Sequence, residues 1–186
     1  VNYVVNVLPL PSANGTDQTI CGGQLVNIAI DASPKNVVGT TFNWIVLPTS
    51  NVNGAVAGNG SLISQNLSLT NSLVGSVVYR ITPTANNCIG PVKDITVTIN
   101  PPAFVSAGPD LKLCEDTPSI ILNGSISGST TTVNWTGGTG LFSDPASVTP
   151  NYTFNNPSEI NSIVTFTVTT NDPDGPTGPC LVATDN

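Results

Sequence analysis

The chain has 186 residues and a formal net charge of −7, and 8% of its side chains are charged. This balance excludes the basic face that nucleic-acid binding requires. No apolar run approaches the roughly 18 residues of a membrane-spanning helix, so we expect neither a nucleic-acid partner nor membrane insertion. Asn, Ser and Thr replace charged residues as the solvated side chains, as is common on cell surfaces.

The first half predicts short β-strands divided by turns, because Val, Ile and Thr are abundant and no helical period is present. Residues 1–10 are interpreted as the closing strand of a preceding repeat, since they parallel residues 94–101. Phe42 and Trp44 should share one face of their strand, and Gln65 interrupts an otherwise apolar face. We expect strands at 18–20, 24–30, 40–46, 62–69, 77–82 and 92–99.

The second half follows the same plan. A Gly-rich tip at 137–140 and a long Asp/Pro/Gly loop at 171–179 separate its later strands. Short strands with turns every 8–12 residues are typical of a β-sandwich, so the predicted fold class is all-β. We expect strands in this half at 111–114, 120–122, 132–135, 148–154 and 163–169.

Two cysteines and one tryptophan recur in the same order in each half. Cys88 follows Cys21 by 67 positions, and Cys180 follows Cys114 by 66. A repeat of this size is a whole domain, so the chain is predicted to be a tandem array of Ig-like sandwiches. The predicted boundaries are 1–10 for the preceding repeat's strand, 11–102 for one repeat, and 103–186 for a second repeat that lacks its last strand.

The four cysteines predict one disulfide within each repeat, because one pair stands at matching positions in each half. That bridge would join the leading strand to the closing hairpin. Two other pairings are possible, and both would cross-link separate domains. A zinc site is not indicated, since it needs ligands two to four residues apart and the sequence contains no Cys-x-x-Cys. The expected compartment is oxidising and extracellular.

A calcium site is the sharpest ligand hypothesis. Asp172 and Asp174 alternate before Gly175, which offers oxygen ligands to a hard cation. Asp110 is expected at the same end of its domain, facing the preceding repeat, and the second half carries the whole net charge of −7. No other cofactor is expected. The alternative is a surface turn that binds nothing.

Catalysis is not predicted. The chain has no His, so no Ser-His-Asp or Cys-His arrangement is possible. Trp44 and Trp135 could stack on sugars, but their shared strand positions favour packing in the two cores. We therefore expect a protein that is not an enzyme.

The amino-acid sequences of several segments resemble those of known repeat domains. Residues 107–110 and 121–125 resemble the opening of polycystic-kidney-disease (PKD) domains, which are Ig-like sandwiches of extracellular proteins. Other segments resemble the Cys-containing PKD-like repeats of very large Bacteroidetes surface proteins, including gliding-motility adhesins exported by type 9 secretion. These segments are residues 64–70, 81–90, 134–140 and 178–180.

The resemblance implies a structural or adhesive segment of a very large cell-surface adhesin, acting as stalk or contact region. Its partners would be neighbouring repeats of the same chain and possible surface polysaccharide. The alternative is a non-catalytic spacer or carbohydrate-binding module of a secreted polysaccharide-degrading enzyme, which an exposed aromatic strip would favour. A third interpretation of the chain's ends is strand donation between copies, which differs from simple truncation.

Overall fold

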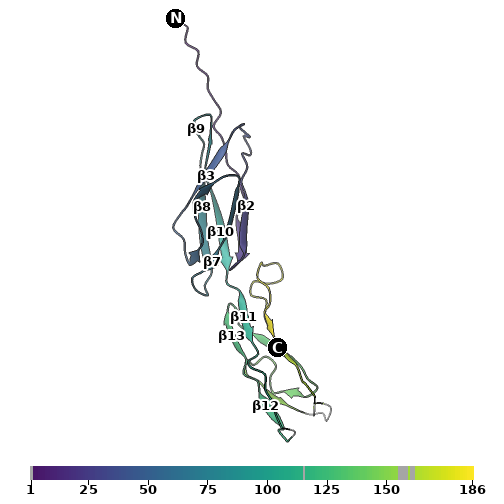
Figure 1. The fold of residues 1–186 in the computed structure, drawn as a ribbon. Coiled ribbons are helices and arrows are strands. Elements are labelled where there is room, and N and C mark those ends of the chain that lie inside the picture. The colour runs from purple at the N-terminus through teal and green to yellow at the C-terminus, as the bar shows by residue number, and fades with distance from the viewer. Residues whose placement is uncertain (1, 115, 155–158, 160–161) are drawn as a thin grey trace. The chain divides into compact units, whose positions relative to one another are not determined.

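The computed structural model describes residues 2–114, 116–154, 159 and 162–186. These residues form strands, turns and loops and contain no α-helix, which confirms the predicted all-β class. The chain divides into two compact units, Val1–Asn100 (unit 1) and Pro101–Asn186 (unit 2), and each is described by itself (Figure 1). Residues 2–10 form no strand within the structure, and their side chains are exposed.

Unit 1 is built on a six-stranded sheet in which β10 lies between β1 and β8. The pairing of β1 with β10 is parallel, and the other pairings are antiparallel. Two smaller sheets pair β2 with β6 and β4 with β7. The strands are β1 Gln18–Cys21, β2 Leu25–Ala29, β3 Thr41–Val46, β4 Val52–Asn53, β5 Gly58–Asn59, β6 Leu62–Asn66, β7 Ser68–Leu69, β8 Gly75–Ala85, β9 Cys88–Ile89 and β10 Lys93–Asn100.

The core of unit 1 lies between these sheets. Burial alternates along β2, β8 and β10, as expected for strands that pack one face inward. One layer contributes β-branched side chains from β2 and β6, and the large sheet contributes a second layer. The fully buried members include Val26, Ile28, Ile63, Val77, Tyr79, Ile81, Ile95, Val97 and Ile99. This arrangement is a two-layer β-sandwich.

Gln65, which interrupts the apolar face of its strand, has a structural role. Its Oε1 accepts hydrogen bonds from the Tyr79 hydroxyl at 2.7 Å and from Val56 N at 3.0 Å. Its Nε2 donates to Val56 O at 2.8 Å, and Trp44 Nε1 donates to the same carbonyl at 3.2 Å. Burial raises the pKa of Tyr79 to about 12. The amide thus satisfies a buried hydroxyl and ties a loop to the core.

Unit 2 consists of three small sheets rather than one large one. These pair β11 with β13, β16 with both β12 and β15, and β17 with both β14 and β18. The strands are β11 Ala103–Ser106, β12 Ser119–Ile121, β13 Ser125–Gly128, β14 Val133–Gly137, β15 Leu141–Phe142, β16 Asn151–Thr153, β17 Phe166–Thr170 and β18 Thr184–Asp185.

The core of unit 2 is smaller and depends more on aromatic side chains. Leu122, Val133, Trp135 and Val168 form its buried cluster. Beside it, edge-to-face contacts join the rings of Phe142, Tyr152, Phe154 and Phe166. Such contacts add to the free energy gained from burial alone.

A hydrogen-bonded carboxylate completes this aromatic cluster. The buried Tyr152 hydroxyl donates to Glu159 Oε1 at 2.7 Å and accepts from Gly140 N, and Thr139 N also donates to Glu159 Oε1. Burial by itself raises the pKa of the Glu159 carboxyl. The hydrogen bonds from Thr139 and Tyr152 outweigh it and hold this pKa below its ordinary value of 4.5.

Two predictions about strands in unit 2 are wrong. The leading strand expected at 111–114 is irregular, and Leu111 and Leu113 are about half exposed because no neighbouring strand covers them. Conversely, residues 125–128, where no strand was expected, form β13, which pairs with β11. The partner strand decided this, since residues 111–114 alternate as a strand does but have no partner, whereas 125–128 are held as a strand by β11.

We expect Gln65→Leu to lower the free energy of unfolding of unit 1 by about 1–3 kcal/mol, because it leaves the buried Tyr79 hydroxyl without an acceptor. Urea denaturation followed by tryptophan fluorescence measures this loss. Asn27→Leu, at an exposed position of β2, is the matched control and should change stability little. Equal losses in the two variants would contradict the role assigned to Gln65.

Unit 2 should lose stability as the pH falls below about 4.5, because Glu159 has a lower pKa in the folded state than in the unfolded chain. The stabilisation is fully present above the unfolded value and is lost as the pH falls through the folded one. Thermal unfolding is measured between pH 7 and pH 3. The melting temperature of Glu159→Gln should fall less steeply at acid pH than that of the wild type. Asp116→Asn removes a charge from an exposed turn and should leave the wild-type dependence of melting temperature on pH unchanged.

Candidate functional site

The four cysteines lie at the ends of the units. We call the end of each unit at which the chain comes in, marked by Pro11 in unit 1 and Pro101 in unit 2, the proximal pole. The opposite end is the distal pole. Each unit carries one cysteine at each pole, and the strand registers place them.

Cys21 lies at the distal pole of unit 1. It is the last residue of β1 and pairs with Asn100, the last residue of β10. Gly22 N donates to Asn100 O at 2.9 Å, and Ile99 pairs with Gly75, the first residue of β8. The end of β10 and the beginning of β8 therefore surround this cysteine.

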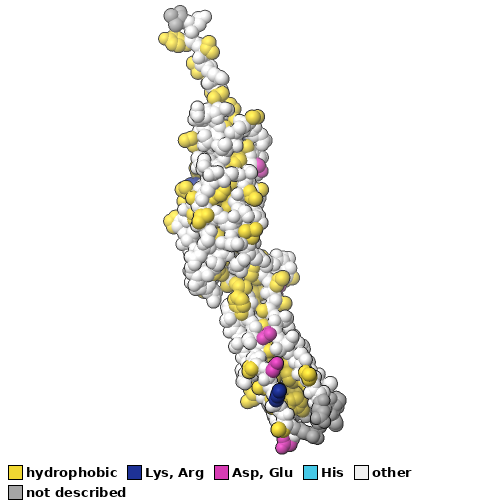
Figure 2. Space-filling view, in the orientation of Figure 1, with side chains coloured by type: hydrophobic (Ala, Val, Ile, Leu, Met, Phe, Trp, Pro, Cys, Tyr) yellow, Lys and Arg dark blue, Asp and Glu magenta, His cyan; other side chains and the backbone are white. Residues whose placement is uncertain are grey.

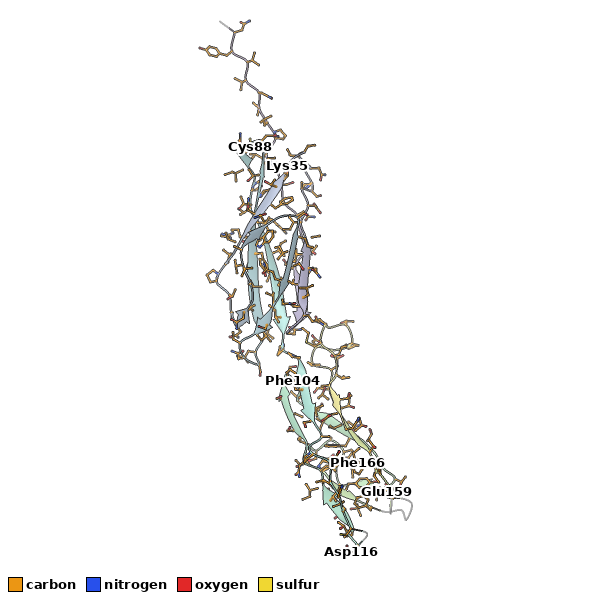
Figure 3. The ribbon with its side chains drawn as sticks, in the orientation of Figure 1. Lys35, Cys88, Phe104, Asp116, Glu159 and Phe166 are labelled. Atoms are coloured by element: carbon orange, nitrogen blue, oxygen red, sulfur yellow. The ribbon has the colours of Figure 1, made fainter. Side chains whose placement is uncertain are left out.

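Cys88 lies at the proximal pole of unit 1. It pairs with Ala85, the last residue of β8, in a tight hairpin whose Asn86 and Asn87 have positive φ. Gly90 follows, and it packs so closely against Pro11 O that a Cβ would not fit there. Figure 3 shows Cys88 at the end of unit 1 beside the N-terminal segment.

The length of β8 keeps these two cysteines apart. Gly75 and Ala85 mark its two ends, and ten residue steps of about 3.3 Å separate them by roughly 33 Å. A disulfide requires a Cα–Cα distance of about 4.4–6.8 Å. Cys21 and Cys88 therefore cannot be bonded to each other within unit 1.

Cys180 lies at the proximal pole of unit 2. Its Sγ is 3.7 Å from Pro101 O. The preceding loop is held at its start by Asn171 Oδ1, which accepts 3.0 Å hydrogen bonds from Thr131 N and Thr132 N. At its end, both oxygens of Asp174 accept from Cys180 N at 3.3 Å. Side-chain hydrogen bonds thus position this buried cysteine.

Cys114 lies toward the distal pole of unit 2. Its carbonyl accepts from Thr117 N, one turn before β12. From Ser119 the chain runs through β12 and β13 to Gly128, which pairs with Ala103 near the proximal pole. Figure 3 shows Asp116 and Phe104 at opposite ends of this unit. Two successive strands therefore separate Cys114 from Cys180, far beyond disulfide reach.

The bonding states follow these positions. Cys21 and Cys180 are disulfide-bonded, whereas Cys88 and Cys114 are free. The structure therefore differs from the expected bridge within each repeat, because each repeat holds its two cysteines at opposite poles. The matching spacing in the two halves reflects matching positions in the fold and not a bond between the two cysteines of one repeat.

The three aspartates of the calcium hypothesis are not brought together. Among the described residues, no group of three or more His, Cys, Asp or Glu side chains could hold a metal ion. Asp172 Oδ1 accepts from Asp174 N at 3.3 Å, and Asp174 accepts from Cys180 N, so both carboxylates organise their own loop. Asp110 is exposed and follows β11, a strand that leads away from the proximal pole.

Both tryptophans lie in the cores. Trp44 is 6% exposed and Trp135 is 2% exposed. The aromatic rings that remain exposed among the described residues are Tyr3 and Phe104, one in each unit. No aromatic strip for stacking on sugar rings is therefore formed by the described part of the chain.

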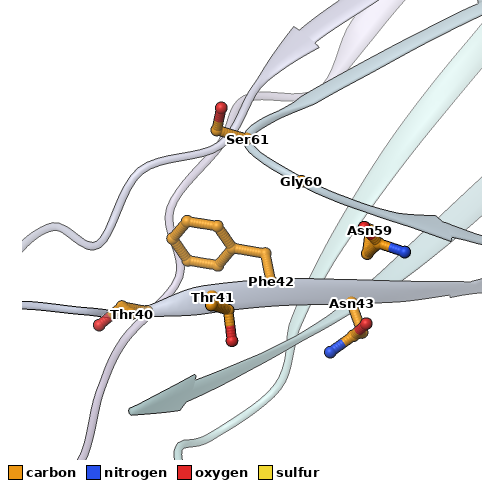
Figure 4. A pocket seen from close by; sticks show the side chains of 7 residues that line it. All are labelled: Thr40, Thr41, Phe42, Asn43, Asn59, Gly60 and Ser61. Carbon is orange, nitrogen blue, oxygen red and sulfur yellow. The ribbon is translucent and has the colours of Figure 1, made fainter.

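A shallow pocket lies at one edge of the large sheet of unit 1, with a volume of about 340 Å³. Asn43 on β3 pairs with Asn59 on β5 at its rim. The side chain of Phe42 projects from β3 between them and Ser61, but it is buried in the core (Figure 4). The polar lining residues are Thr40, Thr41, Asn43, Asn59 and Ser61. Hydroxyl and amide groups thus dominate the lining of this pocket.

The visible surface of both units is mostly polar without being charged. Figure 2 shows widely spaced Lys, Arg, Asp and Glu side chains among uncharged ones. Among the described residues, Arg80 and Asp94 form an ion pair, with Arg80 Nη2 2.7 Å from Asp94 Oδ2. Each of the two side chains is 41% exposed. No helix in the described residues has the length and apolar character needed to cross a membrane.

Comparison with known proteins gives one family match. Residues 18–103 match the model of the PKD-like domain family. The match begins at the first residue of β1 and ends at the first residue of β11, so it covers the sandwich of unit 1. No curated protein matches the chain.

Several solved structures of tandem domains are similar to the chain. They include human CDH23 EC21-23, with 12% identity, a TM-score of 0.36 and coverage of 95% of this chain. This chain spans 63% of the length of that CDH23 fragment. A chimeric titin Z1Z2-Z1Z2 tandem has 13% sequence identity to the chain and a TM-score of 0.29. The match covers 94% of this chain and 95% of the titin tandem. The titin Ig tandem domains A164-A165 have 11% sequence identity and a TM-score of 0.25. That match covers 95% of this chain and 96% of the titin fragment.

Asp174→Ala should destabilise unit 2 by about 1 kcal/mol, because it removes the acceptor for Cys180 N. The loss should be the same in millimolar calcium and in chelator, since the carboxylate acts on its own loop. Differential scanning calorimetry of both proteins in both buffers measures this. A wild-type melting temperature that rises with calcium, and an Asp174→Ala melting temperature that does not, would show that the aspartate is a metal ligand.

Proposed function

We propose that this chain is a structural or adhesive repeat segment of a very large extracellular cell-surface adhesin, acting as stalk or contact region. The match of residues 18–103 to PKD-like domains supports the repeat type. The disulfide-bonded state of Cys21 and Cys180 supports an oxidising, extracellular location. The adhesin is of the gliding-motility type, exported by type 9 secretion, as the resemblance of residues 81–90 and 134–140 suggests.

The observation that carries this proposal is the path of the chain through unit 1. The chain comes in at Pro11, beside Gly90 at the proximal pole, and leaves at Asn100, beside Cys21 at the distal pole. Domains whose two termini lie at opposite poles can be joined in series, and tension then acts along the strands. A repeat of a stalk needs this geometry.

The first and last strands of unit 1 suit such tension. β1 and β10 run parallel and pair over four residues, from Gln18 with Val97 to Cys21 with Asn100. Asp17 Oδ1 adds a 2.8 Å hydrogen bond from Thr96 N. A pull on the two termini draws these strands in opposite directions, so their hydrogen bonds share the load instead of opening one at a time.

The surface chemistry agrees with an exposed spacer. Uncharged hydroxyl and amide groups keep the chain soluble, and charged side chains make up 8% of it. The described residues provide no cluster of metal-ligating side chains, and the sequence has no His. The proposal therefore assigns no catalytic activity to these repeats. Its partners are neighbouring repeats of the same chain, and the contact region would take surface polysaccharide.

Protease shaving of intact cells tests the proposal. An antibody raised against this fragment should detect a very large protein on an immunoblot of untreated cells, and mild protease treatment of the cells should remove that band. A cytoplasmic protein serves as the control and should stay intact. A modest-sized band found in the culture medium would contradict the adhesin.

That contradicting result would favour the second candidate, an accessory module of a secreted polysaccharide-degrading enzyme. The pocket beside Asn43 and Asn59 is the observation in its favour. The buried state of Trp44 and Trp135 opposes it, since carbohydrate modules stack sugars on exposed rings. Titration of the fragment with plant and algal polysaccharides, compared with Asn59→Ala, would reveal binding at this pocket.

A further inference from the structure

The segment of unit 1 that precedes Pro11 has the pattern of a strand without being paired as one. Apolar side chains stand at alternate positions, Tyr3, Val5 and Val7, and would share one face of a strand. They are 90%, 80% and 85% exposed, and the segment extends free of the strands of unit 1 (Figure 1). Covering such a face with a sheet gains free energy, so the segment is suited to add a strand to one.

The pattern of this segment matches β10, the closing strand of unit 1. When Pro9 is aligned with Pro101, the three apolar side chains fall on Ile95, Val97 and Ile99. These three side chains of β10 are fully buried. β10 holds them there because it lies between β8, to which it is antiparallel, and β1, to which it is parallel. The free segment has the side chains that a strand in such a place requires.

Unit 2 contains an equivalent place, which the strand registers locate. The core tryptophan pairs with Ile81 of β8 in unit 1 and with Val168 of β17 in unit 2, so β17 corresponds to β8. Each of these two residues has a second partner on its other side, Lys93 at the start of β10 and Asp185 in β18. β18 therefore corresponds to the beginning of β10.

Beyond β18, the same edge of β17 has no partner among the described residues. β14 pairs along the opposite edge, and β18 pairs only with Val168 and Thr169. Phe166 and Val164 are partly exposed, and Ile163 is 96% exposed. In unit 1, the residues of β8 equivalent to the first two are buried in register with β10. Unit 2 thus leaves apolar side chains uncovered where β10 covers them in unit 1.

A second segment borders this edge. Ala107 N donates to Asp185 Oδ2 at 2.9 Å, so the chain that leads to residues 111–114 begins beside β18. Both leucines of 111–114 are about half exposed, whereas β1, the matching segment of unit 1, pairs with β10. We call residues 111–114 and 163–166 together the slot of unit 2.

We propose that residues 3–8 of a second copy of this chain enter the slot of unit 2 and extend its sheet antiparallel to β17. The register follows from the equivalence of β18 with the start of β10. Tyr3 of the incoming strand then faces Phe166, and Val5 faces Val164. The side chain of Val4 points to solvent, at the place of a threonine of β10.

The chemistry of the incoming strand favours a second copy as the occupant. Residues 2–10 contain no charged side chain, so their entry buries no charge beside unit 2, which carries the net charge of −7. The strand and the slot belong to different units, so each copy can donate one and receive the other. Such a contact is heterologous and joins copies head to tail. The inference concerns the association of separate copies and does not depend on the proposed adhesin.

Two aspartate variants of the full chain test the proposal by sedimentation velocity over a series of concentrations. The average mass of the wild type should rise with concentration. Val5→Asp should remain a monomer, because it places a carboxylate against Val164 in the covered face. Val4→Asp makes the same change on the solvent face of the strand and should associate like the wild type. Residues 2–10 form no strand in their own unit, so neither variant should impair folding.

A wild type that stays a monomer at every concentration would overturn the proposal. Equal loss of association in the two variants would also overturn it, since that result would show pairing without a preferred face. Neither result would affect the adhesin proposal, because protease shaving tests it separately.

A peptide of residues 2–9 locates the slot. It is added to the Val5→Asp chain, whose own segment does not compete, and amide hydrogen exchange is followed by mass spectrometry. Exchange should slow in residues 111–114 and 163–166, and the same peptide carrying Val5→Asp should have no effect. Protection confined to other strands, or no protection by the wild-type peptide, would overturn the proposal.

Discussion

The antiparallel pairing of β8 with β10 is the constraint on which the arrangement of unit 1 depends. It holds seven residue pairs in register, from Lys93 with Ile81 to Ile99 with Gly75. Because β8 extends beyond this pairing to Ala85, it carries Cys88 to one pole, while the end of β10 holds Cys21 at the other. The two poles of unit 1, the path of its chain and the separation of Cys21 from Cys88 all follow from these two long strands.

The two units are stabilised by different proportions of aliphatic burial and aromatic contacts. Unit 1 buries a continuous set of β-branched side chains between its sheets, and Gln65 provides hydrogen bonds there for Tyr79 and Val56. Unit 2 has a smaller buried cluster and relies on aromatic edge-to-face contacts capped by the Glu159 carboxylate. Gln65 can occupy an inward position because both its amide oxygen and its amide nitrogen are hydrogen-bonded.

The limits of the sequence prediction appear at particular residues. The strands at 24–30, 40–46 and 92–99 were found within about one residue, because their side chains alternate clearly between core and solvent. Residues 111–114 showed a similar pattern but have no partner strand, whereas 125–128 lack the pattern and form β13 through β11. The aspartates at 172 and 174 were recognised as an oxygen-rich turn, but only their hydrogen bonds to Asp174 N and Cys180 N revealed a loop that organises itself.

The sequence by itself determined the all-β class, the repeat and the burial of both tryptophans, because these depend on local alternation and on spacing along the chain. It could not determine which cysteines are bonded. Spacings of 67 and 66 residues fit a bridge within a repeat as well as two cysteines held apart at opposite poles of it. Only the tertiary structure decided this, since the strand registers place the two cysteines of each unit at opposite poles, beyond the few ångströms that a disulfide can span.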